Sequence, residues 1–387
     1  MIRLRQSSGL GLAAMRCVPA LVFLLACSSD SIPEQPGWAY GGFGSDHASG
    51  VVENGQGKLV VIGTTNSFGA RDDDVYLFEI DSVGHLLWQR AFGGSGTEQG
   101  LGIAQCGDGG YAAVGATNSF PEPDNRAVYL VRVDSSGILQ WQSIIFYDAM
   151  ASSDIGRCVR QTADGGFLIG GDYSSFGQTS AYIIKTDASG YATSKRLLQG
   201  EGEATSHSVV ETGDGNYVLA GSTWTFDRPH PDIYLVEVNP LGDTLWSRTI
   251  SDTLSSYAEA IVRTDSGCYL VSGEAGTTSG GVFRGRLFTV CVDSAGTPIW
   301  RTTFGDSIWD PGGLSTSIAG CPDGGCVVAC EYSIYRLTRT GELVWQVAFG
   351  GVTKSASAMR NMDYAVAGDR RDDAYILMVN ADGTPIQ

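Results

Sequence analysis

The sequence has few of the residues and motifs that mark common enzyme classes. It contains only four histidines, and they lie at unrelated positions, so no histidine cluster is indicated: His47, His85, His207 and His230. It contains no Gly-x-Ser-x-Gly turn and no His-Glu-x-x-His segment, the motifs of many serine hydrolases and zinc proteases. Glycine-rich stretches such as Gly93–Gly96 do not stand between a strand and a helix, so they are interpreted as turns. No catalytic residue and no metal site is therefore predicted.

Charged residues are scarce as well, at 17% of the chain, while aromatic residues reach 10% and there are 53 glycines. A disordered chain would combine dense charge with few aromatic residues, so the composition indicates a folded protein. The net charge of −17 opposes binding to nucleic acid or to an anionic membrane surface. We therefore expect no nucleic-acid partner.

The apolar run near the N-terminus is too short to span a membrane, which takes about 20 residues. This run, Val18–Ala26, is interrupted only by Pro19 and follows a basic segment without acidic residues, which is the pattern of a secretory signal. It ends in Leu-Leu-Ala-Cys at residues 24–27, which resembles the lipobox of bacterial lipoproteins.

The lipobox resemblance implies cleavage before Cys27 and attachment of lipid to this residue. The chain then divides into a signal peptide (1–26), a tether (27–37) and a single domain (38–387). The protein would be anchored in the bacterial cell envelope, at the outer membrane or cell surface, with the lipid as its only membrane contact. An ordinary signal peptide with an incidental cysteine is the alternative, and it predicts a secreted protein.

An internal repeat of about fifty residues is the strongest pattern in the chain. Tryptophan recurs at positions 38, 88, 141, 246, 300 and 345, and Ser194 and Gln387 stand where the series predicts two more. Upstream of these positions, at constant spacing, lie seven pairs of a turn residue and a glycine: Asp81/Gly84, Asp134/Gly137, Asp187/Gly190, Asn239/Gly242, Asp293/Gly296, Thr338/Gly341 and Asn380/Gly383. The spacing predicts hairpin turns in which the polar side chain caps the backbone and glycine adopts a positive φ.

Each repeat also carries the signals of four short strands. Strand-like runs such as Leu86–Phe92 and Ala127–Val133 alternate with Gly-Gly and Asp-Gly-Gly turns. Repeated four-stranded units of this length predict an all-β, seven-bladed β-propeller of antiparallel blades. We expect the tryptophans to pack between neighbouring blades. We also expect Trp38–Gly41 to complete the blade built from residues 346–387 and so to close the ring.

The repeat resembles those of two groups of known propellers. The run Tyr129–Trp141 is similar to the repeat of quinoprotein-dehydrogenase-like propellers, although the sequence has no adjacent Cys-Cys pair, which weakens a pyrroloquinoline interpretation. The closer resemblance is to secreted bacterial repeat proteins, through their Gly-x-Thr-x-Ser-Phe-Gly segment: residues 63–69, 115–120, 171–177 and 221–226. It implies the propeller fold and no particular activity. Repeats six and seven depart from it, at Cys330 and near Met362.

Aromatic residues in these segments are the candidate ligand contacts. Phe68, Phe120, Phe176 and Phe226 share one register, which is also what packing of each ring onto its own blade would produce. Trp224 departs from that register, so Trp224, Phe226 and Asp227 are the candidate ligand-binding residues. A surface glycan or another protein is the expected partner, and a monomer is the expected state.

Acidic clusters offer weak metal ligands. Asp72–Asp74 and Asp372–Asp373 supply the oxygens that Ca²⁺ prefers, and Asp227, His230 and Asp232 form a mixed group. None of them has the spacing of a calcium-binding loop, so solvated acidic loops are the preferred interpretation. No cofactor is predicted.

Seven cysteines follow Cys27, and four of them form candidate pairs. Cys321 and Cys326 flank a turn, while Cys268 and Cys291 are expected on neighbouring strands. Both pairs are candidate disulfides in an exported protein, and buried free thiols are the alternative.

Two functions remain open from the sequence. The missing catalytic motifs favour a binding or interaction propeller without catalysis. The alternative is a propeller enzyme, quinoprotein-like or carbohydrate-active, with its site at the mouth of the central channel. Three or more ionisable side chains from different blades, brought together at that mouth, would favour the enzyme.

Overall fold

The computed structural model describes residues 37–69, 72–119, 126–146, 152–175, 177–198, 202–224, 230–279, 282–308 and 316–386. Residues Gln35–Gln387 form one compact unit. The predicted signal peptide and Cys27 lie outside the described residues, so the lipid anchor stays a prediction. Within the described part of the chain, no helix has the length and apolar character needed to cross a membrane.

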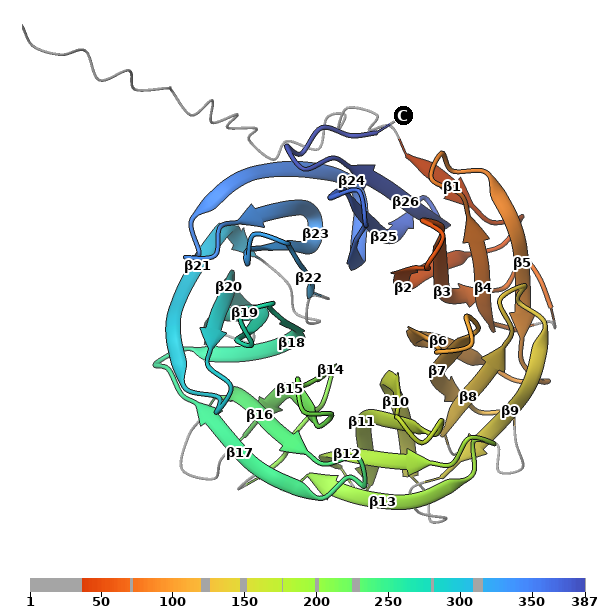
Figure 1. Cartoon of the computed structure of the whole chain (residues 1–387), viewed down its shortest axis with the longest axis horizontal. Coiled ribbons are helices and arrows are strands. Elements are labelled where there is room, and N and C mark those ends of the chain that lie inside the picture. The colour runs from red at the N-terminus through yellow and green to blue at the C-terminus, as the bar shows by residue number, and fades with distance from the viewer. Residues whose placement is uncertain are drawn as a thin grey trace, which may run out of the picture. The chain divides into compact units, whose positions relative to one another are not determined.

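The described strands form a ring of antiparallel sheets around a central opening (Figure 1). Five sheets have four strands each, ordered from the centre outwards. They are β2 (Asp46–Glu53), β3 (Leu59–Thr65), β4 (Asp74–Ile80) and β5 (Leu86–Phe92); β6 (Glu98–Gln105), β7 (Tyr111–Thr117), β8 (Ala127–Val133) and β9 (Leu139–Ile145); β10 (Ser152–Gln161), β11 (Phe167–Ser175), β12 (Gln178–Thr186) and β13 (Ala192–Leu198); β14 (Ser208–Glu211), β15 (Tyr217–Thr223), β16 (Asp232–Val238) and β17 (Thr244–Ile250); and β18 (Ser255–Arg263), β19 (Tyr269–Ser279), β20 (Val282–Val292) and β21 (Pro298–Ile308).

The sixth sheet has six strands and carries the last two sequence repeats. Its order is β1 (Trp38–Tyr40), β26 (Asp373–Val379), β25 (Tyr364–Arg370), β24 (Leu343–Ala358), β23 (Cys326–Leu337) and β22 (Thr316–Gly320). The strand β24 is 16 residues long and pairs with β23 through its first half and with β25 through its second half. It therefore runs without a break from the sixth repeat into the seventh.

The prediction of seven four-stranded blades is therefore wrong. The described strands form six sheets, so the propeller has six blades when a blade is a continuous hydrogen-bonded sheet. The physical reason is the loss of a strand break: β24 joins two repeats that the turn spacing had separated. This is the region in which the sequence pattern was already degenerate.

The predicted closure of the ring by the N-terminal strand is confirmed. Trp38, Ala39 and Tyr40 of β1 pair antiparallel with β26, so the two ends of the propeller share one sheet. The Tyr40 hydroxyl also donates a hydrogen bond of 2.6 Å to the Gly84 carbonyl in the first complete repeat. The strand β1 thus belongs to the last sheet and contacts the first.

The repeated tryptophans pack on the glycine turns of the next repeat. All seven turn glycines have a positive φ, between 74° and 86°. At six of them a Cβ atom would lie within 3.0 Å of a tryptophan ring: Trp38 on Gly84, Trp88 on Gly137, Trp141 on Gly190, Trp246 on Gly296, Trp300 on Gly341 and Trp345 on Gly383. Gly242 lacks this contact because Ser194 replaces the tryptophan of the preceding repeat. The glycine thus satisfies two constraints, backbone conformation and close approach of a ring.

The hydrophobic core is divided among the interfaces between repeats. One cluster joins Val61 and Phe78 of the first sheet to Ile376 and Met378 of the last, and another joins Ile62 to Tyr129 of the second sheet. The middle strands of a sheet are buried on both faces, as the uniformly buried β3 and β4 show. Packing between repeats therefore supplies the core that no single repeat has.

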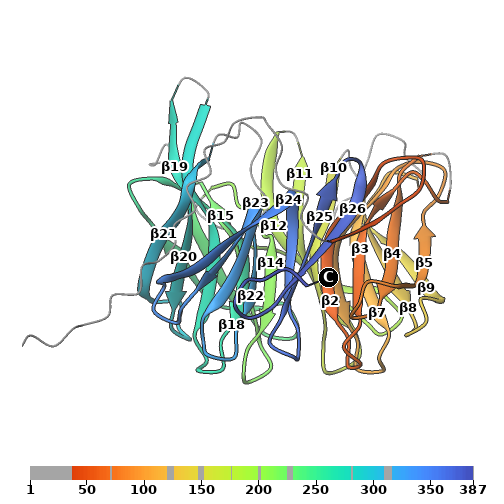
Figure 2. The same cartoon turned by 90° about the horizontal axis from the view of Figure 1, so that it is seen from above.

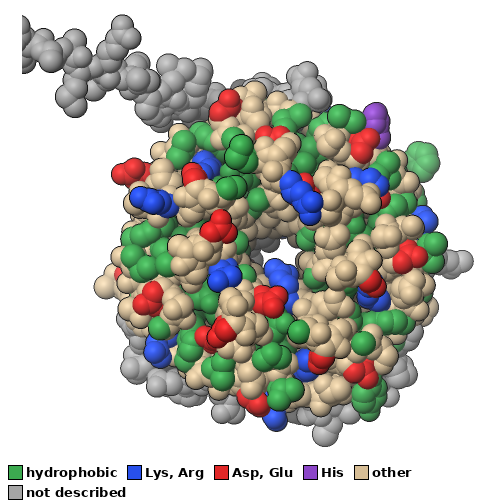
Figure 3. All heavy atoms as spheres, in the orientation of Figure 1, with side chains coloured by type: hydrophobic (Ala, Val, Ile, Leu, Met, Phe, Trp, Pro, Cys, Tyr) green, Lys and Arg blue, Asp and Glu red, His purple; other side chains and the backbone are tan. Residues whose placement is uncertain are grey.

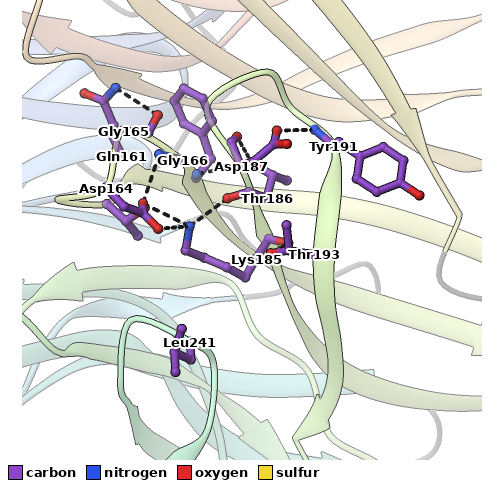
Figure 4. A network of polar contacts seen from close by, with 12 residues as sticks. Gln161, Asp164, Gly165, Gly166, Lys185, Thr186, Asp187, Tyr191, Thr193 and Leu241 are labelled. Atoms are coloured by element: carbon purple, nitrogen blue, oxygen red, sulfur yellow. Dashed lines mark hydrogen bonds and ion pairs between the residues drawn. The ribbon is translucent and has the colours of Figure 1, made fainter.

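In several repeats a buried cation on the third strand binds the turn between the first two strands, which we call the inner turn. Figure 4 shows the example of Lys185 and Asp164. The Lys185 ammonium is 4% exposed, lies 3.0 Å from Asp164 and donates a hydrogen bond of 2.6 Å to the Thr186 carbonyl. Arg132 and Arg336 make the same ion pair with the turn residues Asp108 and Asp323. These contacts satisfy a buried charge at one end of the ring.

The tryptophan–glycine contact predicts a position-specific cost for alanine. Gly109→Ala introduces only the strain of a side chain at φ 85°, because nothing lies within 4 Å of its Cβ position, and should cost about 1 kcal/mol. Gly137→Ala adds a clash with Trp88 at 2.6 Å and should cost about 3 kcal/mol. Urea unfolding at pH 7 measures both. Equal costs for the two variants would show that the ring contact is unimportant.

Candidate functional site

The innermost strands of all sheets enclose a central cavity of about 540 Å³. Its lining comes from β2, β6, β10, β14, β18, β22 and β24, so every repeat contributes. Figure 3 shows the opening at the centre of the ring, with lysine or arginine side chains at its edge. The volume is in the range of small-molecule sites.

A ring of β-bulges determines which side chains line one level of this cavity. In five innermost strands the pairing register skips one residue, and the skipped residues occupy equivalent positions: Ser49, Leu101, Arg157, Glu259 and Lys354. His207 and Thr316 occupy the same position in the remaining repeats, at the same distance before the inner turn. All seven residues line the cavity. Bulges redirect side chains and are common beside active sites. We call these seven residues the bulge ring.

The cavity is positively charged although the chain is acidic. Its lining contains Arg157, Arg160 and Lys354 but only one carboxylate, that of Glu259, in a chain of net charge −17. The Arg157 guanidinium donates to Asp172, and this carboxylate also accepts a hydrogen bond of 3.0 Å from the Ser206 backbone. Asp172 therefore holds Arg157 in place.

Two of these cations form no ion pair with a described carboxylate. Arg160 donates a hydrogen bond of 2.9 Å to the Val159 carbonyl, and burial lowers its pKa. Within the described residues, neither Arg160 nor Lys354 has a carboxylate at ion-pair distance. Half-buried cations without an ion-pair partner favour an anionic ligand in this cavity.

His207 and Glu259 form a pair inside the cavity. The imidazole Nδ1 lies 2.8 Å from a Glu259 carboxylate oxygen, within ion-pair distance but without the angles of a good hydrogen bond. Burial opposes charging of the imidazole, but the Glu259 carboxylate outweighs it and raises the pKa of His207, against the opposing field of Arg157. An imidazole of raised pKa is a stronger base and is suited to proton transfer near neutral pH.

The ionisable residues Arg157, His207, Glu259 and Lys354 come from four different repeats. This is the arrangement that favours the enzyme alternative over a binding propeller. The sequence showed His207 as an isolated histidine, because its partners lie in other repeats. Alignment of the repeats on their inner turns would have placed these residues at one position, and this signal was missed.

The sequence-predicted ligand residues lie elsewhere or cannot be placed. Trp224 directly follows β15 and packs edge-to-face against Tyr257, with ring centroids 6.0 Å apart. Phe226 and Asp227 lie outside the described residues, as do Phe120 and Phe176. Phe68 stacks on Tyr76 of its own sheet, at 5.6 Å, so for this residue the packing interpretation holds.

Of the candidate metal ligands, Asp232 accepts a hydrogen bond of 3.0 Å from the Ser251 hydroxyl. Other acidic side chains bind the repeated segment. The Asp46 carboxylate accepts hydrogen bonds from the Thr65 and Ser67 hydroxyls, and Glu98 does the same with Thr117 and Ser119. These contacts explain the Thr-x-Ser part of the repeated segment. Among the described residues, no three acidic, histidine or cysteine side chains form a group that could hold a metal ion.

The seven described cysteines are free thiols, so neither candidate disulfide is formed in this structure. Cys321 accepts a hydrogen bond of 3.0 Å from the Tyr364 hydroxyl. Burial, together with the neighbouring Cys268, raises the pKa of Cys291 to about 11, so its thiol stays protonated at neutral pH. Oxidation of either pair to a disulfide stays a prediction.

Comparison with protein families gives a match to this chain. The model described as Arylsulfotransferase (ASST) matches residues 70–286, which is more than half of the chain and includes β4 to β20 up to Arg286. Comparison with curated protein sequences finds no match.

Several solved structures share the propeller fold. Sqt1 from Chaetomium thermophilum is 14% identical, with 92% of this chain and 88% of that chain covered and a TM-score of 0.52. BamB from Moraxella catarrhalis is 11% identical, with 89% and 98% covered and a TM-score of 0.50. A puromycin hydrolase is 14% identical, with a TM-score of 0.57; the match covers 89% of this chain and 53% of the hydrolase. At these identities the likeness concerns the fold alone.

The charge of the cavity predicts that it binds a small oxyanion. Lys354→Gln and Arg160→Gln should each weaken binding of inorganic sulfate about tenfold, because each removes a cation that has no described carboxylate at ion-pair distance. Arg196→Gln is the matched control, since Arg196 is exposed and paired with Asp243 on the outer surface. Isothermal titration calorimetry with sodium sulfate measures the change. An equal loss in the control variant would show non-specific electrostatics.

Proposed function

Because the chain belongs to the arylsulfotransferase (ASST) family, we propose that it is a sulfotransferase whose reaction takes place in the central cavity. The observation that carries this proposal is the cation-lined cavity that holds the His207–Glu259 pair inside an acidic protein. The family match supports the reaction class, and the bulge ring supports the location.

The reaction class needs an anion site and a group that moves a proton. An aryl sulfate donates its sulfuryl group to an acceptor phenol: the S–O bond to the donor oxygen breaks and a new S–O bond forms to the acceptor oxygen. The acceptor loses its phenolic proton, and the departing phenolate takes one up, so atoms and charge balance. Cations beside the transferring group stabilise the charge on its oxygens and on the leaving phenolate.

The residues that line the cavity match these two requirements. Arg157, Arg160 and Lys354 supply the positive charge around a bound sulfate ester. His207 accepts the proton of the acceptor phenol and returns it to the donor phenolate. Glu259 is a positioning residue in this proposal, because it acts through the imidazole by raising its pKa.

Transfer of the sulfuryl group is the direct test. Wild-type protein should release 4-nitrophenol from 4-nitrophenyl sulfate when phenol is the acceptor, with formation of phenyl sulfate. His207→Gln should lower kcat at least about 100-fold, the usual contribution of a general base. His85→Gln is the control, because His85 lies in an outer turn beside Asp81.

Two outcomes would contradict the proposal. Wild-type protein that binds sulfate but transfers no sulfuryl group would be a binding propeller. Activity that survives in His207→Gln would place the chemistry elsewhere.

The Glu259 carboxylate also predicts a shift in pH dependence. Because Glu259 raises the pKa of His207, Glu259→Gln should lower that pKa. The unprotonated base then exists at lower pH, so the rising limb of kcat/KM against pH should move to lower pH in the variant. An unchanged limb, in a variant that still folds by circular dichroism, would show that His207 is not the titrating group.

A further inference from the structure

Three aromatic side chains form a cluster that spans two neighbouring sheets. Trp224 follows β15, Tyr257 lies in the innermost strand β18, and Phe283 lies in β20. Trp224 and Tyr257 meet edge-to-face with ring centroids 6.0 Å apart, and Tyr257 and Phe283 meet in the same way at 5.7 Å. We call these three residues the aromatic cluster.

The aromatic cluster lies directly along the strand from the bulge ring. Tyr257 is two residues before Glu259 in β18, so the two backbone positions are about 7 Å apart along an extended strand. The backbone N–H of Trp224 donates a hydrogen bond of 2.8 Å to the Glu203 carbonyl, so Trp224 is held beside the segment that leads to His207 and β14. The cluster is therefore next to the two repeats that supply His207 and Glu259.

The long hairpin of β19 and β20 carries the third member of the cluster. These strands have 11 residues each, against seven in the corresponding β15 and β16. Figure 2 shows this hairpin extending beyond the other strands on one face of the ring. Phe283 pairs with Thr278 near the tip of this hairpin.

The three rings differ in burial from the aromatic residues of the core. Tyr182, Tyr217 and Tyr269, in the neighbouring sheets, are at most 2% exposed. Trp224, Tyr257 and Phe283 are each only partly buried. Edge-to-face contacts leave ring faces available, and partly exposed aromatic faces attract another flat ring.

We propose that the aromatic cluster binds the aryl ring of the sulfate ester while the cations of the bulge ring bind its sulfate group. This inference rests on the proposed function and adds the substrate's second anchor. The strand β18 would then contribute to both parts of the site, with Tyr257 beside the aryl ring of the ligand and Glu259 beside its sulfate group. Selection for an aromatic ring comes from the cluster, and selection for the charge comes from the cavity.

The test compares ligands that share the sulfate group and differ in the ring. Binding of 4-nitrophenyl sulfate, methyl sulfate and inorganic sulfate is measured by calorimetry on the full chain. Trp224→Ala should weaken the binding of 4-nitrophenyl sulfate about tenfold and leave the binding of methyl sulfate and inorganic sulfate unchanged. Phe283→Leu keeps an apolar side chain and should show the same selectivity with a smaller loss. Phe68→Leu, which removes a ring stacked on Tyr76 in another repeat, is the matched control and should change none of the three.

The outcomes separate this inference from the proposed function. Unchanged aryl sulfate binding in Trp224→Ala and Phe283→Leu, with transfer activity intact in the wild type, would overturn the aromatic anchor alone. Equal weakening of all three ligands would also overturn it, because the cluster would then act only by supporting the fold. Absence of any sulfate or aryl sulfate binding in the wild type would overturn both proposals.

Discussion

The contact between a tryptophan side chain and the glycine turn of the next repeat is the constraint on which the rest of the propeller depends. The indole can approach the turn closely only because the turn residue has no side chain. The turn itself needs a positive φ, which glycine adopts without strain. Repetition of this contact fixes the spacing from each repeat to the next. The first example, Trp38 on Gly84, is made by the strand that also completes the last sheet, so the same contact closes the ring.

A closed ring brings one position of every repeat to a common centre. Each repeat contributes one residue of the bulge ring, although these residues are tens of positions apart in the sequence. In most repeats of such an array the position is free to vary, because it faces the cavity and not the core. Here it has diverged into a cation, an imidazole, a carboxylate and small or apolar side chains, which makes a polar site from a repetitive scaffold.

The sequence predicts the fold well where a local constraint is strict. The turn glycines, the antiparallel strands, the packing role of the tryptophans and the closing strand at Trp38 all follow from spacing, because each has a short-range physical cause. The blade count was wrong for a different reason. Whether β24 breaks between repeats six and seven depends on pairing with both neighbours, which turn spacing does not report.

The candidate site was harder to predict because it is assembled from different repeats. His207 carries no local motif, and its partner Glu259 lies one repeat later at the same position. Trp224 stood out because it departs from the repeat, and the structure places it against Tyr257. The repeated Phe68 has a packing role instead. Departures from a repeat were therefore more informative about the site than the repeat itself.

A crystal structure with selenate in place of sulfate tests the central claim most directly, because the anomalous signal of selenium locates the anion without ambiguity. The account predicts a selenate in the central cavity, in contact with Arg157, Arg160 or Lys354 and beside His207. An ordered selenate found only on the outer surface, with the cavity free of it at saturating concentration, would contradict the account.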